Sequence, residues 1–156
     1  MDVRLRAADR TDLPALIPLV HGLLKLQGRP FNLFEVEQSL LPLLNGDPAR
    51  GAWLIEARRS AIGYATLSVC HSMAAGGCTA IVDQLFVREE ARGHGAGGSA
   101  LRLLLAEARR AGAAVLQVRA GPLAGELQRL LAAAAGREPD PVTFLELPLA
   151  GNGVRR

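Results

Sequence analysis

The residues of this chain whose types and spacing are best suited to binding a ligand lie between positions 87 and 99. The cluster reads Val87-Arg88-Glu89-Glu90-Ala91-Arg92-Gly93-His94-Gly95-Ala96-Gly97-Gly98-Ser99 and lies between a strand-like segment and a helical pattern. Glycines let a backbone approach a ligand closely and turn its N–H groups inward. The first turn of a helix adds unpaired N–H donors and partial positive charge. Together with the permanent cation of Arg92, these features predict a binding site for an anion such as phosphate.

The kind of anion is less well defined by the cluster itself. Gly93, Gly95 and Gly98 satisfy the dinucleotide pattern G-x-G-x-x-G, but residues 88–92 separate the first glycine from the strand that it should follow at once. A Walker-type phosphate loop needs a lysine, and the only lysine is the distant Lys25. A glycine-rich turn without a ligand is a further alternative, although so many glycines ahead of a helix carry an entropic cost.

The same cluster fits the pattern R-x-x-G-x-G at residues 92–97, shortly after Asp83-Gln84-Leu85-Phe86-Val87. In these two features the chain resembles the GCN5-related N-acetyltransferase (GNAT) family. Ile62-Gly63-Tyr64-Ala65 in the preceding strand and the opening Arg6-Ala7-Ala8-Asp9 are also similar to that family. The resemblance extends through Gly112 and is most specific over residues 83–105.

The resemblance implies that acetyl-CoA is the acyl donor. The amides of residues 92–97 would hold its pyrophosphate, and the backbone of Leu85 and Val87 would pair with its pantetheine arm. Splayed strands at 79–87 and 115–119 would place the thioester in a cleft, where an amine attacks directly, without a covalent acyl-enzyme. The implied cofactor-binding residues are Leu85, Phe86, Val87, Arg92, Gly93, His94, Gly95, Ala96, Gly97 and Gly98.

Asp83 is the first candidate for a catalytic base or an anchor for the acceptor amine, because it is an acid within an apolar strand. In a regular strand it would share a face with Ile81 and Leu85. An ordinary aspartate is a weak base, so burial or a bridging water would have to assist it; the alternative is an exposed or structurally bonded carboxylate. His71, at the end of the preceding strand, is the second candidate, against the alternative of a solvated loop histidine.

One departure from the family leaves two functions open. Members often carry an Asn after the fifth strand and a Tyr on the next helix, which protonates the leaving thiolate, but residues 121–131 contain neither. The only tyrosine, Tyr64, lies on an earlier strand and is expected to pack in the sheet. The first hypothesis is therefore an N-acetyltransferase that acts on a primary amine of a small molecule or peptide. The second is a non-catalytic CoA-binding module or sensor.

The elements that must position these residues follow from hydrophobic periodicity and turn signals. We expect strands at residues 3–7, 52–58, 62–70, 79–87, 115–119 and 142–149. Helices are expected after a Thr11 cap, from Asn32 towards Leu44, from the glycine cluster to about Ala111, and at 123–135. This order, β-α-α-β-β-β-α-β-α-β, predicts an α/β (α+β) domain, and the resemblance implies a mixed, largely antiparallel, twisted sheet flanked by helices.

Composition sets the broader expectations. With 156 residues, of which 49% are hydrophobic, the chain predicts a single domain at 1–150 and a short tail at 151–156. No apolar run reaches the roughly 20 residues of a membrane span, and the first residues lack a signal-peptide core, so a cytoplasmic protein without a membrane partner is expected. A net charge of +3 with scattered arginines does not favour nucleic acid. Cys70, Cys78 and the three histidines match no metal motif, and the cysteines are expected to be reduced. The resemblance implies a homodimer.

Overall fold

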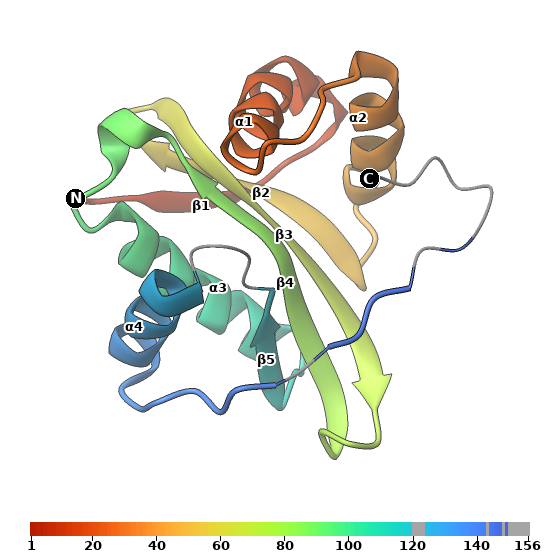
Figure 1. The fold of residues 1–156 in the computed structure, drawn as a ribbon, viewed down its shortest axis with the longest axis vertical. Coiled ribbons are helices and arrows are strands. Elements are labelled where there is room, and N and C mark those ends of the chain that lie inside the picture. The colour runs from red at the N-terminus through yellow and green to blue at the C-terminus, as the bar shows by residue number, and fades with distance from the viewer. Residues whose placement is uncertain (120–123, 143, 148, 150–156) are drawn as a thin grey trace.

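The computed structural model describes residues 1–119, 124–142, 144–147 and 149. One five-stranded sheet forms the middle layer, in the order β1-β2-β3-β4-β5, and every neighbouring pair is antiparallel except the parallel pair β4–β5 (Figure 1). The strands are β1 (Arg4–Ala7), β2 (Arg50–Ala57), β3 (Ser60–Ser72), β4 (Gly77–Val87) and β5 (Val115–Val118). The helices are α1 (Leu13–Leu26), α2 (Leu33–Leu40), α3 (Ala96–Arg110) and α4 (Ala124–Ala135). The mixed, largely antiparallel sheet confirms the expected fold class.

Two hairpins build the centre of the sheet. β2 and β3 are joined by Arg58 and Arg59, which both have positive φ angles, of 49° and 65°. Such a two-residue turn matches the twist of the flanking strands, although it normally contains Asn or Gly. The β3–β4 hairpin is longer, and its tip extends past the end of β2, where the last paired residues are Arg50 and Ser68. This tip carries the cysteines and His71 away from the middle of the sheet.

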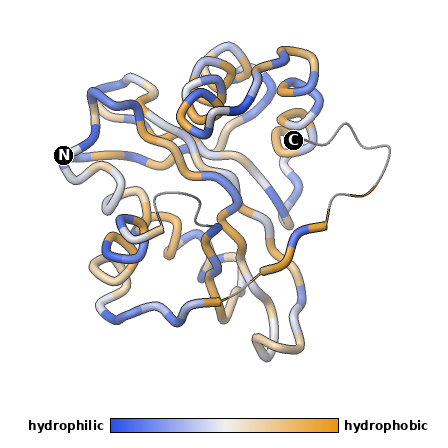
Figure 2. Tube along the Cα trace, in the orientation of Figure 1, coloured by the Kyte–Doolittle hydropathy of each residue, from blue (hydrophilic) through white to orange (hydrophobic). Residues whose placement is uncertain are grey.

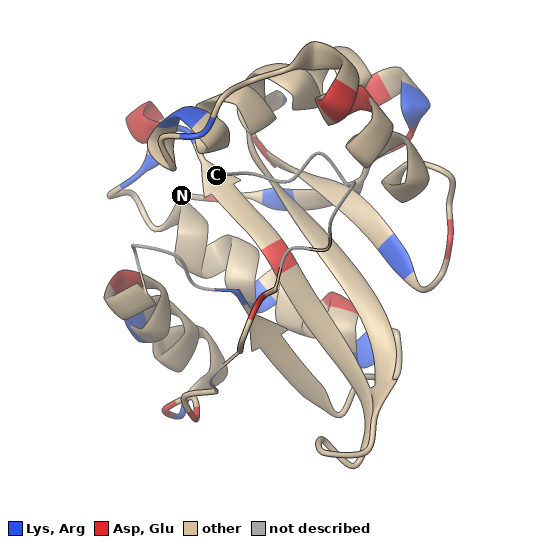
Figure 3. Cartoon of the chain, turned by 45° about the vertical axis from the view of Figure 1, so that its right-hand side comes forward, with Lys and Arg blue, Asp and Glu red and all other residues tan. Residues whose placement is uncertain are grey.

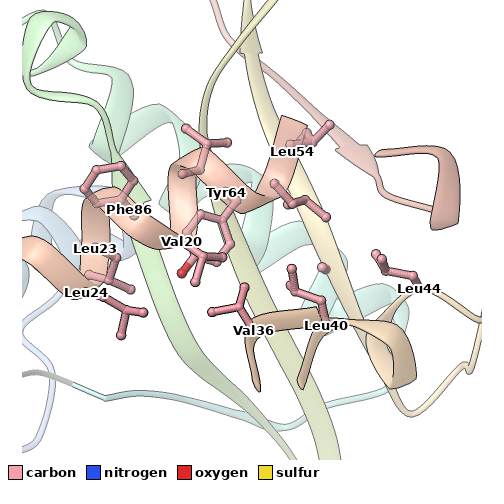
Figure 4. Close-up of a cluster of buried hydrophobic side chains, with 12 residues drawn as sticks. Val20, Leu23, Leu24, Val36, Leu40, Leu44, Leu54, Tyr64 and Phe86 are labelled. Carbon is pink, nitrogen blue, oxygen red and sulfur yellow. The ribbon is translucent and has the colours of Figure 1, made fainter. Parts of the chain in front are cut away.

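The two faces of the sheet are covered by different helices. One cluster of buried side chains fills the space between α1, α2 and the sheet (Figure 4). Its members from the helices are aliphatic, and Leu54, Tyr64 and Phe86 face them from the strands. A second cluster packs α3 and α4 against the opposite face, around Leu101 and Leu104. Because apolar residues alternate along β2 and β3, each strand contributes side chains to both clusters.

The helix starts were only partly predicted. Asn32 caps α2 as expected, since its side chain accepts the N–H of Glu35 at 3.1 Å. Thr11 is not a helix cap: α1 starts at Leu13, and Asp9 caps a short 3₁₀ turn at residues 10–12. There the carboxylate of Asp9 accepts the Thr11 N–H at 2.8 Å, and Asp12 accepts the Asp9 N–H at 3.0 Å. The N–H groups of this first turn are therefore capped by the carboxylates of Asp9 and Asp12, and not by Thr11.

The expected sixth strand is not formed. Among the described residues of the stretch 142–149, none is paired as a strand, and Val142, Phe144, Leu145, Leu147 and Leu149 are exposed. We call residues 142–149 the C-terminal segment. Figure 2 shows its described part as mostly hydrophobic, interrupted by one hydrophilic stretch. The apolar pattern that predicted a strand was present, but a strand also needs a hydrogen-bonding partner, and the described structure offers this segment none. The predicted tail at 151–156 lies outside the described residues.

Two further findings concern the broader expectations. Cys70 is paired with Thr79, and Cys78 with His71, so the two cysteines project from opposite faces of the hairpin and are free thiols. No helix in the described ranges is long and apolar enough to span a bilayer.

Candidate functional site

The glycine cluster forms a loop of unpaired backbone donors between β4 and α3. Gly93 and Gly95 adopt the left-handed conformation, with φ angles of 74° and 82°, and Gly95 is the N-cap of α3. Within the described structure, the N–H groups of residues 93–98 donate no hydrogen bond to a backbone carbonyl. Helical bonding begins with the Ser99 N–H, which donates to Gly95 O at 3.0 Å. Consecutive free N–H groups at a helix start can bind an anion, which is the role that the sequence predicts for this loop.

The glycines of this loop have two different roles. A Cβ atom at Gly93 or Gly95 would meet nothing within 4 Å, so glycine is required there by the backbone conformation. A Cβ at Gly97 would lie 3.5 Å from Leu130 of α4, and one at Gly98 would lie 3.9 Å from the same side chain. Gly97 and Gly98 thus let α4 pack closely over the first turn of α3.

The side chains of Arg92 and His94 hold the loop in place. Arg92 Nε donates to the carbonyl of Val87 at 2.8 Å, and its guanidinium lies 5.5 Å from the centre of the Phe86 ring. The arginine therefore folds back onto the end of β4 and ties the loop to the strand. His94 Nδ1 lies 2.7 Å from Arg92 O. The carbonyl oxygen of His94 accepts a hydrogen bond of 3.0 Å from the N-terminal ammonium group of Met1. That the backbone of His94 contacts a ligand stays a prediction.

The end of β4 has an open backbone edge beside this loop. β5 pairs with β4 only from Thr79 to Val82, and the last contact is the Arg119 N–H to Val82 O at 3.0 Å. Beyond this point, residues 83–87 have no strand partner on the β5 side in the part of the chain that the structure describes. On its other side, this stretch is paired with β3. The open edge can hydrogen-bond an extended ligand in the way that a sheet accepts an added strand.

A β-bulge positions Asp83 at the start of this open edge. Thr66 is paired with Gln84 and Leu67 with Val82, so Asp83 is an extra residue on β4. The bulge reverses the alternation: Val82 packs towards α3, whereas Phe86, four residues later, packs towards α1. The expectation that Asp83 shares a face with both Ile81 and Leu85 is therefore wrong, because a regular strand was assumed.

The carboxylate of Asp83 is not buried. Its side chain is 52% exposed and forms an ion pair with Arg119, whose Nε lies 3.1 Å from Asp83 Oδ1. Arg119 also lies 3.7 Å from Glu146 Oε2 in the C-terminal segment. Figure 3 shows the described part of the C-terminal segment passing beside β4, with acidic colour on both. The structure thus joins three distant parts of the chain at one point, and no local pattern in the sequence pointed to Arg119 or Glu146.

Tyr64 and Gln84 form a buried polar pair next to the bulge. The hydroxyl of Tyr64 donates to Gln84 Oε1 at 2.9 Å, and the N–H of Gln84 donates to Thr66 Oγ1 at 3.1 Å. Burial raises the pKa of Tyr64 far above its ordinary value, and the nearby charge of Asp83 raises the same pKa further. Tyr64 packs in the sheet as predicted and stays protonated at neutral pH. Gln84 was missed, although a second polar residue in an apolar strand was a visible signal.

His71 lies far from Asp83 in the structure. It is exposed on the hairpin tip opposite Cys78, five residues along β4 from Asp83. Five residues of strand span about 16 Å, so the two candidate bases are too far apart to share one acceptor.

Two cavities of the described structure lie away from this edge and loop. One, of about 340 Å³, is lined by Trp53, Leu67 and the C-terminal end of α3, and another, of about 390 Å³, lies between Arg4 and the β2–β3 turn. No group of three or more His, Cys, Asp or Glu residues suited to a metal ion occurs in the described ranges. The candidate site therefore consists of the unpaired edge of β4 and the loop that follows it.

Comparisons with known proteins agree with this arrangement. The family model described as the acetyltransferase (GNAT) family matches residues 20–124, well over half of the chain. An integron cassette protein from the mobile metagenome of Cole Harbour Salt Marsh, HFX_CASS3, has a similar structure, with a TM-score of 0.78 and 28% identity, over 94% of this chain and 90% of that chain. A search of the curated proteins finds no significant match.

Two enzymes of lower identity share the fold. Ribosomal-protein-alanine N-acetyltransferase from Brucella melitensis biovar Abortus 2308 has a TM-score of 0.74 and 17% identity, over 96% of this chain and 100% of that chain. The aminoglycoside N-acetyltransferase AAC(6')-Iy, solved in complex with CoA, has a TM-score of 0.72 and 18% identity, over 95% of this chain and 96% of that chain. The family resemblance seen in the sequence is confirmed.

Proposed function

The chain belongs to the acetyltransferase (GNAT) family, and from this premise we propose that it transfers an acetyl group from acetyl-CoA directly to a primary amine of a small molecule or peptide. The observation that carries the proposal is the run of free N–H groups at residues 93–98, which lies next to the open edge of β4. A diphosphate and an extended amide-containing arm are the two chemical groups that these features complement. The solved relative that was crystallised with CoA has the same fold.

The residues of the chain divide the task between binding and proton transfer. In the proposal, the loop amides hold the pyrophosphate, and the backbone of Leu85 and Val87 pairs with the arm. Acetyl-CoA supplies an activated acyl group. The C–S bond of the thioester breaks as the new C–N bond forms, and the sulfur of CoA leaves and takes up one proton. Asp83 anchors the acceptor ammonium, whose proton passes to this carboxylate or, through water, to solvent before attack. The nitrogen gives up a second proton once the amide is formed, so that one proton is released overall.

The donor site is tested by comparing two glycines with the same backbone strain. Gly95 and Gly112 lie at opposite ends of α3, both have a φ of 82°, and a Cβ atom added at either position would meet nothing within 4 Å. Gly95→Ala and Gly112→Ala therefore share a conformational cost of roughly 1–2 kcal/mol. Only the first changes the loop. We expect CoA affinity, measured by calorimetry, to fall at least tenfold, about 1.4 kcal/mol, in Gly95→Ala alone.

Equal CoA affinity in these two variants would remove the donor site from residues 93–98. Arg92→Ala gives an additional check. Because Arg92 ties the loop to Val87, its loss is expected to weaken CoA binding by loosening the loop.

A second candidate function, a CoA-binding module or sensor without turnover, is favoured by one observation. The only tyrosine of the chain is fully buried and bonded to Gln84, which leaves it poorly placed to protonate a thiolate. A panel of amines with detection of released thiol distinguishes the two functions. Turnover with any acceptor supports the transferase, whereas tight CoA binding without thiol release from any amine supports the sensor. A homodimer remains a prediction from the family resemblance, and a cytoplasmic location remains a prediction from the sequence.

A further inference from the structure

The turn between β2 and β3 combines a strained backbone with two arginines. Arg58 and Arg59 have φ angles of 49° and 65°, and no other non-glycine residue in the described ranges has a positive φ. Other left-handed positions are occupied by glycine, as at Gly28, Gly46 and Gly112. A long side chain disfavours this conformation, because its Cβ atom crowds the backbone. The turn therefore carries a conformational cost that the usual Asn-Gly pair would avoid.

The two arginine side chains gain no polar contact that would offset this cost. Both are exposed, and within the described structure neither forms a hydrogen bond or an ion pair. Other exposed arginines do have such partners, as Arg50 has in Asp47 and Arg110 has in Glu107. Strained residues are concentrated at functional sites. A strained turn whose charged side chains are available to a ligand is therefore a candidate binding site.

Both arginines of this turn line the cavity of about 390 Å³ between the turn and residues 2–4. Arg4 lines it as well, so three guanidinium groups border one hollow. Of the two carboxylates in the lining, Glu56 is already committed, since Arg4 donates to its Oε2 at 2.6 Å and Arg6 to its Oε1 at 2.9 Å. The other carboxylate is that of the exposed Asp2. The turn therefore adds two positive charges where one carboxylate is uncommitted, and the cavity complements an anion.

The chemistry of the guanidinium group narrows the kind of anion. Its paired N–H donors match two oxygens of a phosphate or a carboxylate. A phosphomonoester carries nearly two negative charges and three terminal oxygens at neutral pH, so it can bind two arginines at once. A carboxylate has one charge and two oxygens. The volume of about 390 Å³ is within the range of small-molecule sites. These properties favour a small molecule that bears a phosphomonoester.

We propose that the turn at 58–59 and residues 2–4 form a second anion site, which binds a phosphomonoester through the three arginines that line it. The site is separate from the loop at 93–98, but the two are linked, because the ammonium group of Met1 contacts the carbonyl of His94. Two sources supply the same chemical group, namely the 3′-phosphate of CoA and a second phosphorylated molecule. With the first source, the inference rests on the proposed function and extends its donor site.

The variants separate the charge of the turn from its strain. Arg58→Asn/Arg59→Gly introduces the residues preferred at these positions, so we expect a higher Tm, by about 2 °C or more, together with weaker phosphate binding. Arg58→Gln/Arg59→Gln removes the charges but keeps long side chains at the strained positions. It should lose phosphate binding without the gain in Tm. Thermal unfolding followed by circular dichroism measures the first property, and calorimetry measures the second.

Two titrations of the full chain measure the binding and identify the source. In the first, the protein is saturated with dephospho-CoA, which has the pyrophosphate and lacks the 3′-phosphate, and inorganic phosphate is added in mildly alkaline buffer. We expect saturable binding, which both turn variants weaken by about tenfold or more. In the second, CoA is compared with dephospho-CoA. A preference for CoA of about fivefold or more, lost in both variants, assigns the site to the 3′-phosphate. Equal affinities, together with phosphate binding in the first titration, assign it to a second molecule.

A matched control is Arg109→Gln/Arg110→Gln, which removes two adjacent exposed arginines at the C-terminal end of α3. This control should bind phosphate and both forms of CoA as the wild-type protein does. The inference is overturned if the turn variants match the wild-type protein in both titrations. It is also overturned if the control loses as much binding as the turn variants do, since overall positive charge would then explain the result.

Failure of the proposed function is distinguishable from failure of this inference. If neither CoA nor dephospho-CoA binds, the proposed donor site fails. Inorganic phosphate is then titrated into the ligand-free protein, and the same variants decide the inference. Phosphate binding that the turn variants weaken and the control retains supports the second anion site. Absent binding, or equal binding in all of these proteins, overturns it.

Discussion

Two groups of charged residues lie at different places in the sheet and differ in almost every physical property. The first, which we call the N-terminal ion network, consists of Arg4, Arg6, Asp12 and Glu56 and joins β1, the turn before α1, and β2. Its ion pairs measure 2.6–2.9 Å, and its carboxylates are only 11% and 13% exposed. The second is the group of Asp83, Arg119 and Glu146, with distances of 3.1 and 3.7 Å and carboxylates at least half exposed.

The two groups differ in how tightly their charges are bound and in how far they are exposed. Arg6 donates two hydrogen bonds to Asp12 and one to Glu56, so its donors are committed within the protein. These bonds from Arg6 hold the pKa of Asp12 below its usual range, and bonds from Arg4 and Arg6 do the same for Glu56. Arg119 has longer contacts and more exposed partners.

The largest expected effect is on stability. Arg6→Ala leaves the mostly buried carboxylates of Asp12 and Glu56 short of hydrogen-bond partners. We therefore expect the free energy of unfolding to fall by about 1–3 kcal/mol. Because the Arg6 side chain is 38% exposed, we expect a value in the lower half of this range. Arg119→Ala should lower it by about 0.5 kcal/mol or less. Urea denaturation of both variants measures the two changes. Similar losses in both would contradict the division.

Acid should weaken the N-terminal ion network in a defined pH window. The pKa values of Asp12 and Glu56 are lower in the folded protein than in the unfolded chain. Their stabilisation is therefore complete above the ordinary carboxyl pKa, near 4, and is lost as the pH falls through the lower folded values. The stability gap between the wild-type protein and Arg6→Ala should shrink progressively below pH 4. A gap that persists unchanged at pH 2.5 would mean that Arg6 acts by packing alone.

Tyr64 lies near Asp83 of the second group but is buried, and its ionisation is expected to give the smallest of these effects. Its pKa is raised in the folded protein, so folding stability should be lost as the pH rises above about 10, where the unfolded tyrosine ionises, by at most about 1.4 kcal/mol per pH unit. Because it is the only tyrosine, absorbance at 295 nm follows it alone. Ionisation near pH 10 in the folded protein would contradict its burial. Asp83→Asn should move the onset slightly lower.

Local sequence signals predicted the central elements well. Alternating apolar residues and short polar turns located β2, β3 and β4, and glycines marked both ends of α3. The loop at 92–97 was predicted from residue types, because φ angles near 80° at Gly93 and Gly95 are a local property of glycine.

What could not be predicted depends on contacts between distant residues. The bulge at Asp83 reflects the pairing of two strands, which no single strand specifies. Arg119 and Glu146 meet across 27 positions of sequence, and neither has an unusual neighbourhood. The strand predicted at 142–149 had the correct pattern and lacked a partner. Asp9 rather than Thr11 caps the first turn because its carboxylate reaches an N–H that the pattern alone does not identify.

The donors of the loop at residues 93–98 are peptide N–H groups, and a peptide group has no proton to gain or lose near neutral pH. The number of donors that the loop offers is therefore constant from mildly acidic to mildly alkaline solution. Replacing the exposed His94 by a residue other than proline would remove no peptide donor, whereas Ala96 is buried and leaves little room for a larger side chain. If the loop holds the pyrophosphate as proposed, it does so through its main chain, and substitutions at the acceptor side could change the acceptor without changing these donors.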